Sequence, residues 1–240
     1  MIDILAANSR IFRKIRSHLF LPGLLALLAG CSDPITRVAV VGPEPYTVPS
    51  FNYLIFTQSA EQTWNRVLKE FSQSDFRVEE VDSGGRFLQV SLDGPPDRYI
   101  DCGKKTIETL DGGDAGKKIQ IENAASQYRY KVWRRNHLDT YVVRNAFAGE
   151  AGIFVFGDEK QSKIIVQYDL MLKVRVDYTT TQGQRFAKTT EKVLHIKAGE
   201  EQYFEAFGAT CRSTGKFEKE IRDILTADAN EQDLGTDARF

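Results

Sequence analysis

Residues 164–176 read IIVQYDLMLKVRV, and the second half of this run alternates between apolar and charged side chains. The apolar members of this half are Leu170, Leu172, Val174 and Val176. The charged members are Lys173 and Arg175, and Asp177 continues the alternation directly after the run. Because successive side chains of a β-strand point to opposite faces, this pattern predicts a strand with one dry and one wet face. A sheet that is covered on one side only is typically antiparallel.

Further strand-like runs before and after this segment extend the predicted sheet. They are rich in β-branched and aromatic residues and are separated by turn residues. They occupy residues 52–57, 76–81, 87–92, 98–102, 128–133, 153–156, 186–196 and 203–210. The Ser-Gly-Gly sequence at 83–85 predicts a tight hairpin turn in which the glycines take positive φ.

Two helices are predicted, one early and one late in the chain. Ser59, with Gln62 three residues later, forms a capping-box pattern before an apolar helical face. That face consists of Trp64, Val67, Leu68 and Phe71. Ser213 or Thr214 is expected to cap the second helix, which has an apolar face of Phe217, Ile221, Ile224 and Leu225. The predicted fold class is α+β: an antiparallel sheet with a helix after the first strand and a C-terminal helix packed on one face.

Residues 64–92, WNRVLKEFSQSDFRVEEVDSGGRFLQVSL, join the first helix to the following hairpin. This unit resembles the helix–hairpin unit of the BamC-like lipoproteins, accessory components of the outer-membrane protein assembly machine. The resemblance rests on a Trp-x-Arg-Val helix start, an aromatic-x-Val strand, an Asp and a turn glycine: Trp64, Arg66, Val67, Phe76, Val78, Asp82 and Gly85. It implies a helix-grip-like α+β body that is used for protein contacts.

The first thirty residues have the pattern of a signal peptide. A basic segment at 10–16 precedes an apolar run at 19–28, which is about half the length that a transmembrane helix needs. The following Leu-Ala-Gly-Cys sequence at 28–31 resembles the lipobox of bacterial lipoproteins, in which the cysteine is lipidated and becomes the first residue of the mature chain. The alternative is an ordinary secretory signal with an accidental cysteine at the cleavage site.

The lipobox resemblance makes Cys31 the lipidation site, and several acyl chains on one residue give durable membrane attachment. Ser32 stands where the inner-membrane retention signal of that family is typically aspartate. This favours the outer membrane, with the protein facing the periplasm. Asp33, one position later, keeps the inner membrane open as an alternative.

The segment at 31–50 holds four of the seven prolines and is predicted to be a lipidated, extended tether. An edge strand at 38–41 is the alternative for part of it. The expected layout is a signal peptide at 1–30, the tether at 31–50, a periplasmic α+β domain at 51–228 and a polar tail at 229–240.

Charge and cysteine content narrow the expected partners. Without the four basic residues and one acidic residue of 1–30, the remaining 210 residues carry 28 basic and 32 acidic side chains, a net charge of −4. Nucleic-acid binding needs clustered basic surface, so no nucleic-acid partner is expected. Cys102 and Cys211 are the only remaining cysteines, and an oxidising compartment favours a disulfide between them. Two separate buried thiols are the alternative.

No motif points to catalysis, a metal or a cofactor. His137 and His195 are far apart in the sequence and are not at metal-ligand spacing. The G-x-S-x-G and H-E-x-x-H motifs are missing from the sequence, and the glycine-rich run at 111–118 lacks the spacing of a phosphate-binding loop. We therefore expect a protein without enzyme activity.

Residues 128–141, YRYKVWRRNHLDTY, interleave aromatic and basic side chains. Aromatic residues and arginine are enriched at interfaces, so the stretch predicts a contact surface for a protein partner or an anionic envelope component. The candidate contact residues are Arg129, Trp133, Arg134 and Arg135. The alternative is an ordinary strand with a dry aromatic side and a wet basic side.

Two functions are compatible with these features. The first is a non-enzymatic accessory or scaffold component in envelope or outer-membrane assembly. The second is a carrier that holds a lipid-like ligand in an apolar cavity between sheet and helix. A filled core with an exposed aromatic–basic patch favours the scaffold, whereas a deep apolar pocket favours the carrier.

Overall fold

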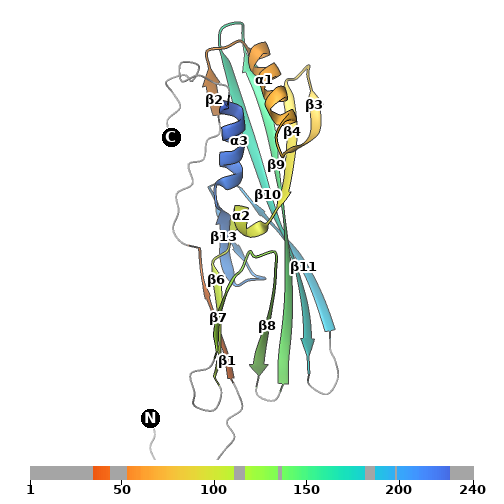
Figure 1. Cartoon of the computed structure of the whole chain (residues 1–240), viewed down its shortest axis with the longest axis vertical. Helices are drawn as coiled ribbons and strands as arrows, with labels where there is room; N and C mark the ends of the chain where they lie inside the picture. The colour runs from red at the N-terminus through yellow and green to blue at the C-terminus, as the bar shows by residue number, and fades with distance from the viewer. Residues whose placement is uncertain are drawn as a thin grey trace, which may run out of the picture. The chain divides into compact units, whose positions relative to one another are not determined.

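Figure 1 shows a computed structural model of the chain, which describes residues 35–43, 53–110, 117–134, 137–181, 187–197 and 199–227. The chain divides into two compact units, Met1–Ser32 and Asp33–Phe240, and the described residues all belong to the second. The predicted signal peptide, Cys31, Arg135 and the predicted tail at 229–240 lie outside the described residues.

Antiparallel sheet dominates the described part of the chain, and helices are few. The largest sheet has the strand order β11-β10-β9-β4-β3, with β2 added to β10 and β8 added to β9. Its strands are β2 (Tyr53–Phe56), β3 (Arg77–Asp82), β4 (Phe87–Gly94), β8 (Gln127–Arg134), β9 (His137–Gly157), β10 (Ser162–Thr180) and β11 (Ala187–Ile196). The predicted antiparallel sheet is confirmed, but the protein is richer in sheet than a balanced α+β fold.

The long hairpin of β9 and β10 organises this sheet. β8 and β4 pair with successive parts of β9, whereas β11 and β2 pair with successive parts of β10. The hairpin therefore runs through two groups of shorter strands, as Figure 1 shows. The runs predicted at 153–156 and 164–176 are only parts of these two strands.

The helices lie over one face of the hairpin. α1 (Ala60–Ser72) begins with the predicted capping box, in which Ser59 and Gln62 bond each other's backbone N–H groups. α1 contacts α3 (Lys216–Thr226) and also contacts β9 and β10 (Figure 1). Beneath them the predicted dry face of the sheet is confirmed at Leu170, Leu172 and Val174, which are buried.

Two three-stranded sheets complete the described fold. One has the order β1 (Ile35–Val41), β6 (Lys104–Leu110), β7 (Lys118–Glu122). The other has the order β12 (Glu201–Phe204), β13 (Ala209–Ser213), β5 (Ile100–Asp101), and the short helix α2 (Pro96–Tyr99) leads into β5.

These small sheets correct three predictions. The tether predicted at 31–50 is wrong for Ile35–Val41, because this segment pairs along its whole length with β6. The strand predicted at 98–102 begins instead with the end of α2. The strand predicted at 203–210 is in fact a hairpin, because β12 and β13 are joined by a turn.

The β3–β4 turn has the predicted position but not the predicted backbone. Neither turn glycine has positive φ; Arg86 has, at 46°. The Asp82 carboxylate accepts hydrogen bonds from the backbone N–H groups of Gly84 and Gly85, at 3.0 and 3.1 Å. A Cβ on Gly85 would lie 2.6 Å from Asp82 Oδ2. A side chain at this position would therefore require the Asp82 carboxylate to shift.

The predicted cap of the last helix is also wrong. The N-cap of α3 is Gly215, which has a φ of 76° and has no side chain to accept a hydrogen bond. Ser213 lies one step earlier, where its hydroxyl accepts from the Gly215 N–H at 2.9 Å and donates to Glu218 Oε2 at 2.9 Å. The serine fixes the helix entry instead of capping it.

The predicted disulfide is confirmed. Cys102 and Cys211 are bonded to each other across 109 residues of sequence. Both cysteines are buried. The bond ties the segment between β5 and β6 to β13, directly before α3.

Candidate functional site

β8 carries most of the predicted contact residues, and its two faces differ. Tyr128 and Val132 are buried on one face, whereas Arg129, Lys131 and Trp133 are exposed on the other. The interpretation as a strand with a dry aromatic side fits the tyrosines. Trp133 departs from it, because its side chain lies on the basic face and is 37% exposed.

The buried face of β8 belongs to a row of neighbouring tyrosines. The ring centroids of Tyr130 and Tyr141 are 4.8 Å apart, and those of Tyr141 and Tyr178 are 5.1 Å apart. Lys105 on β6 places its Nζ 5.0 Å from the centroid of the Tyr130 ring. Burial lowers the pKa of Lys105 and raises the pKa of Tyr130 to about 12. This cation–π contact packs the β1-β6-β7 sheet against β8.

Arg134 does not join Arg129 and Trp133. Its Nε lies 3.1 Å from Oδ2 of Asp139, a carboxylate that is only 2% exposed. The Tyr178 hydroxyl donates to Oδ1 of the same carboxylate at 2.9 Å. Arg134 therefore compensates a buried charge, and the exposed contact surface consists of Arg129, Lys131 and Trp133.

The outer face of the sheet carries an aromatic row that the sequence analysis missed. Here the row means Tyr53, Phe87, Phe154, Phe156 and Ile165, which the strand register places beside one another on β2, β10, β9 and β4. Phe156 is 51% exposed and Tyr53 is 41% exposed. The Phe87 and Phe154 ring centroids are 4.8 Å apart. The available signal was the Phe-x-Phe alternation of β9, which puts both rings on the side opposite the core.

Between the aromatic row and the β8 surface, the outer face is charged and largely self-paired. Asp177 accepts a hydrogen bond from Thr189 and forms ion pairs with Arg144 and Arg175. The hydrogen bond from Thr189, followed by that from Arg144, lowers the pKa of Asp177. His195, which the sequence places outside metal-ligand spacing, is exposed and lies 3.2 Å from Asp169. This region has the character of a solvated face.

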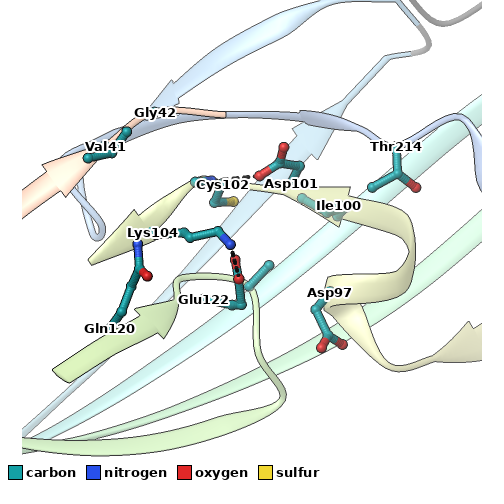
Figure 2. A pocket seen from close by; sticks show the side chains of 12 residues that line it. Val41, Gly42, Asp97, Ile100, Asp101, Cys102, Lys104, Gln120, Glu122 and Thr214 are labelled. Carbon is teal, nitrogen blue, oxygen red and sulfur yellow. Dashed lines mark hydrogen bonds and ion pairs between the residues drawn. The ribbon is translucent and has the colours of Figure 1, made fainter. Parts of the chain in front are cut away.

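A pocket of about 560 Å³ with mixed polar and apolar walls lies beside the disulfide (Figure 2). Its wall includes the end of β1, the α2–β5 segment and parts of β6 and β7. Lys104 Nζ lies 2.8 Å from Glu122 Oε1, and Asp101 accepts a hydrogen bond from the Gly103 N–H at 2.7 Å. A second hollow of about 650 Å³, with more polar walls, lies between α1, β4 and α3, where Arg98 pairs with Glu220 at 2.5 Å.

The space between α3 and the sheet is filled by aromatic side chains. Phe217 of α3 is fully buried, and its ring centroid lies 5.5 Å from that of Phe76 and 6.0 Å from that of Phe147. Gly149 lies directly below, where a Cβ would come 2.4 Å from a Phe217 ring atom. Next to Phe217, burial raises the pKa of the Glu218 carboxyl.

The described residues contain no group of three or more His, Cys, Asp or Glu side chains that could hold a metal ion. None of their helices combines the length and the apolar character that crossing a membrane requires.

Comparison with protein-family models, curated proteins and solved structures finds no match to this chain. The function is therefore argued from the side chains described above.

Proposed function

We propose that this protein is a membrane-anchored periplasmic lipoprotein that acts as a non-enzymatic accessory or scaffold component in envelope or outer-membrane assembly. Lipid on Cys31 anchors it to the outer membrane. The aromatic row on the outer face of the sheet is the contact surface for an envelope protein partner. The fold that presents this surface is helix-grip-like, with α3 laid across one face of an antiparallel sheet.

The exposed aromatic row is the observation that carries this proposal. Contiguous apolar surface on a soluble domain typically marks an interaction site. Two rings of the row, Tyr53 and Phe156, are 41% and 51% exposed, whereas Leu54 and Val155 on the opposite face of the same strands are buried. Lys163 Nζ, 4.5 Å from the centroid of the Tyr53 ring, gives the rim of the row a positive charge.

The filled space below α3 favours a scaffold over a carrier. A carrier needs an apolar cavity that encloses most of its ligand. Phe217 occupies this space, in contact with rings from β9 and from the β3 region. Both hollows described above have charged groups in their walls, Lys104 and Glu122 in the first and Arg98 and Glu220 in the second.

The resemblance to the BamC-like helix–hairpin unit is consistent with this function. Trp64, Val67 and Phe76 are buried between α1 and the sheet, and Asp82 and Gly85 form the turn. These positions therefore serve packing and turn geometry in this chain. A role beside the outer-membrane protein assembly machine is part of the proposal.

Crosslinking from intact cells tests the proposed contact. Phe156→Ser removes the most exposed ring of the row, and Val193→Ser is a matched control because Val193 is 52% exposed on the same outer face. Both changes are expected to shift stability by only about half a kcal/mol. We expect Phe156→Ser to reduce recovery of crosslinked partner proteins and Val193→Ser to leave it unchanged. Equal recovery for both variants would refute the row as the contact surface.

A further inference from the structure

The position of β1 limits how far Trp133 can lie from the proposed lipid anchor. The Trp133 backbone N–H donates to Thr36 Oγ1 at 2.9 Å, and β1 contacts β8. Thr36 is the fifth residue after Cys31. Five residues span at most about 18 Å when fully extended. Whatever path the connecting residues take, the Trp133 backbone therefore lies within roughly 25 Å of Cys31.

The aromatic row is much farther from this point. Trp133 pairs with Leu138 at the start of β9, whereas Phe154 and Phe156 lie near its end. Eighteen residues of strand separate Leu138 from Phe156, which corresponds to about 60 Å. The anchor therefore holds the Trp133 end of the sheet close to the membrane and leaves the aromatic row free to reach farther away.

The exposed side chains at the near end match an anionic bilayer. Arg129, Lys131 and Trp133 alternate with buried or partly buried residues along β8, so all three project from the same face. Neither Arg129 nor Lys131 forms an ion pair with another described residue. Tryptophan favours the interface between lipid and water, and lysine and arginine are attracted to anionic headgroups.

We infer that Arg129, Lys131 and Trp133 form a second membrane contact, which binds the anionic phospholipid surface of the bilayer that holds Cys31. This inference rests on the proposed function, because it requires lipid on Cys31. The acyl chains supply attachment, and the contact on β8 fixes the orientation of the sheet. The aromatic row is thereby presented away from the lipid surface.

Fluorescence quenching in proteoliposomes tests this contact. Trp64 and Trp133 are the two tryptophans of the chain, so Trp64→Phe leaves Trp133 as the only tryptophan emitter. The lipidated protein is placed in vesicles of phosphatidylcholine, with or without an equal part of phosphatidylglycerol, and a brominated phosphatidylcholine is the quencher. We expect strong quenching and a blue shift of Trp133 emission only when phosphatidylglycerol is present. If Trp64→Phe unfolds the protein, the emission of Trp133 is obtained instead by subtracting the fluorescence spectrum of the Trp133→Phe variant from that of the parent.

Charge reversals of matched size separate a local contact from general attraction. Each cation near an anionic surface strengthens binding by about fivefold. The Arg129→Glu, Lys131→Glu variant should therefore lower the ratio of bilayer-bound to unbound β8 surface by about 30-fold or more. Lys69→Glu with Lys160→Glu makes the same change in net charge on α1 and at the far end of the hairpin, where both side chains are exposed. This control should quench like the parent.

The mass of the same preparation distinguishes the two ways of failing. Protein without acyl chains on Cys31 would contradict the proposed function. If the protein is acylated but Trp133 is not quenched, the lipid contact alone is overturned. The same conclusion follows if the Arg129→Glu, Lys131→Glu variant and its control variant are quenched to the same extent. If Arg129→Glu with Lys131→Glu removes the partner crosslinks but leaves the quenching of Trp133 unchanged, the lipid contact is also overturned. The surface would then be assigned to a protein partner.

Discussion

Gly149 offers a direct test of how tightly α3 is packed on the sheet. A methyl group at this position would lie 2.4 Å from Phe217 Cε2 and 2.8 Å from Phe147 Cζ. Phe217 is 0% exposed and Phe147 is 3% exposed, so neither ring has space to swing aside. Overpacking of this kind costs about 1–3 kcal/mol, while replacing glycine by alanine returns about 0.4–1 kcal/mol through the unfolded chain.

We therefore expect Gly149→Ala to destabilise the protein by about 1–2 kcal/mol. For a domain of this size, that corresponds to a fall in melting temperature of about 2–8 °C. Urea unfolding followed by circular dichroism measures the change. Gly152→Ala is the matched control, because its Cβ would meet the half-exposed Phe87 ring at 3.2 Å on the open face, where the ring can move.

A double-mutant cycle shows whether the Phe217 ring is the cause. Phe217→Leu shortens the side chain above Gly149, so the double variant should be more stable than the sum of the single changes predicts, by about 1 kcal/mol. If Gly149→Ala is neutral, or if the two changes add without coupling, the space below α3 is not filled as described. The preference for a scaffold over a carrier would then lose its basis.

Three other changes test separate parts of the structure. Purified protein should show no free thiol at Cys102 or Cys211 in a thiol-titration assay. Reduction of the disulfide should lower the free energy of unfolding by up to about 4–5 kcal/mol, because the bond closes a long loop. Two titrating thiols in the folded, unreduced protein would contradict this. Because burial raises the pKa of Glu218 above its ordinary 4.5, this carboxyl destabilises the fold increasingly as the pH rises above that value. Glu218→Gln should therefore gain stability relative to the parent between pH 4 and pH 7 in urea titrations, and a difference independent of pH would refute the assignment. Gly85→Ala should lower the melting temperature slightly, because the new methyl displaces the Asp82 carboxylate that holds the β3–β4 turn; an unchanged melting temperature would show that this contact is unimportant.

Local sequence patterns predicted the structure correctly where side-chain periodicity and helix capping determine it. The capping box at Ser59 and the alternation that ends at Val174 are both present as predicted. The disulfide could also be predicted, because only two cysteines remain after Cys31. None of these features depends on knowing which distant segment lies next to which.

Long-range pairing explains most of the failures. The middle of β9 contains small and polar residues such as Asn145, Ala146 and Ala148, which do not resemble a strand in isolation. They form one because β10 pairs with this whole stretch, while β8 pairs with the part of β9 before Asn145 and β4 with the part after Ala146. β1 was predicted as tether for the same reason: its partner, β6, lies far away in the sequence.

The candidate site was predicted only in part. The sequence identified Arg129 and Trp133, which the fold keeps on one exposed face. It also grouped Arg134 with them, although Asp139 turns that guanidinium toward a buried carboxylate. The aromatic row needs residues from four strands, and only the register of those strands brings the rings together.

The most direct test of the proposed anchoring is the mass of the N-terminal peptide, measured on protein extracted from membrane fractions. We predict a chain that begins at Cys31 and carries acyl chains on that residue, together with an uncut, unlabelled precursor for Cys31→Ala. A mature chain that begins at another residue, or one with an unmodified Cys31, would contradict the proposal that this protein is a lipoprotein.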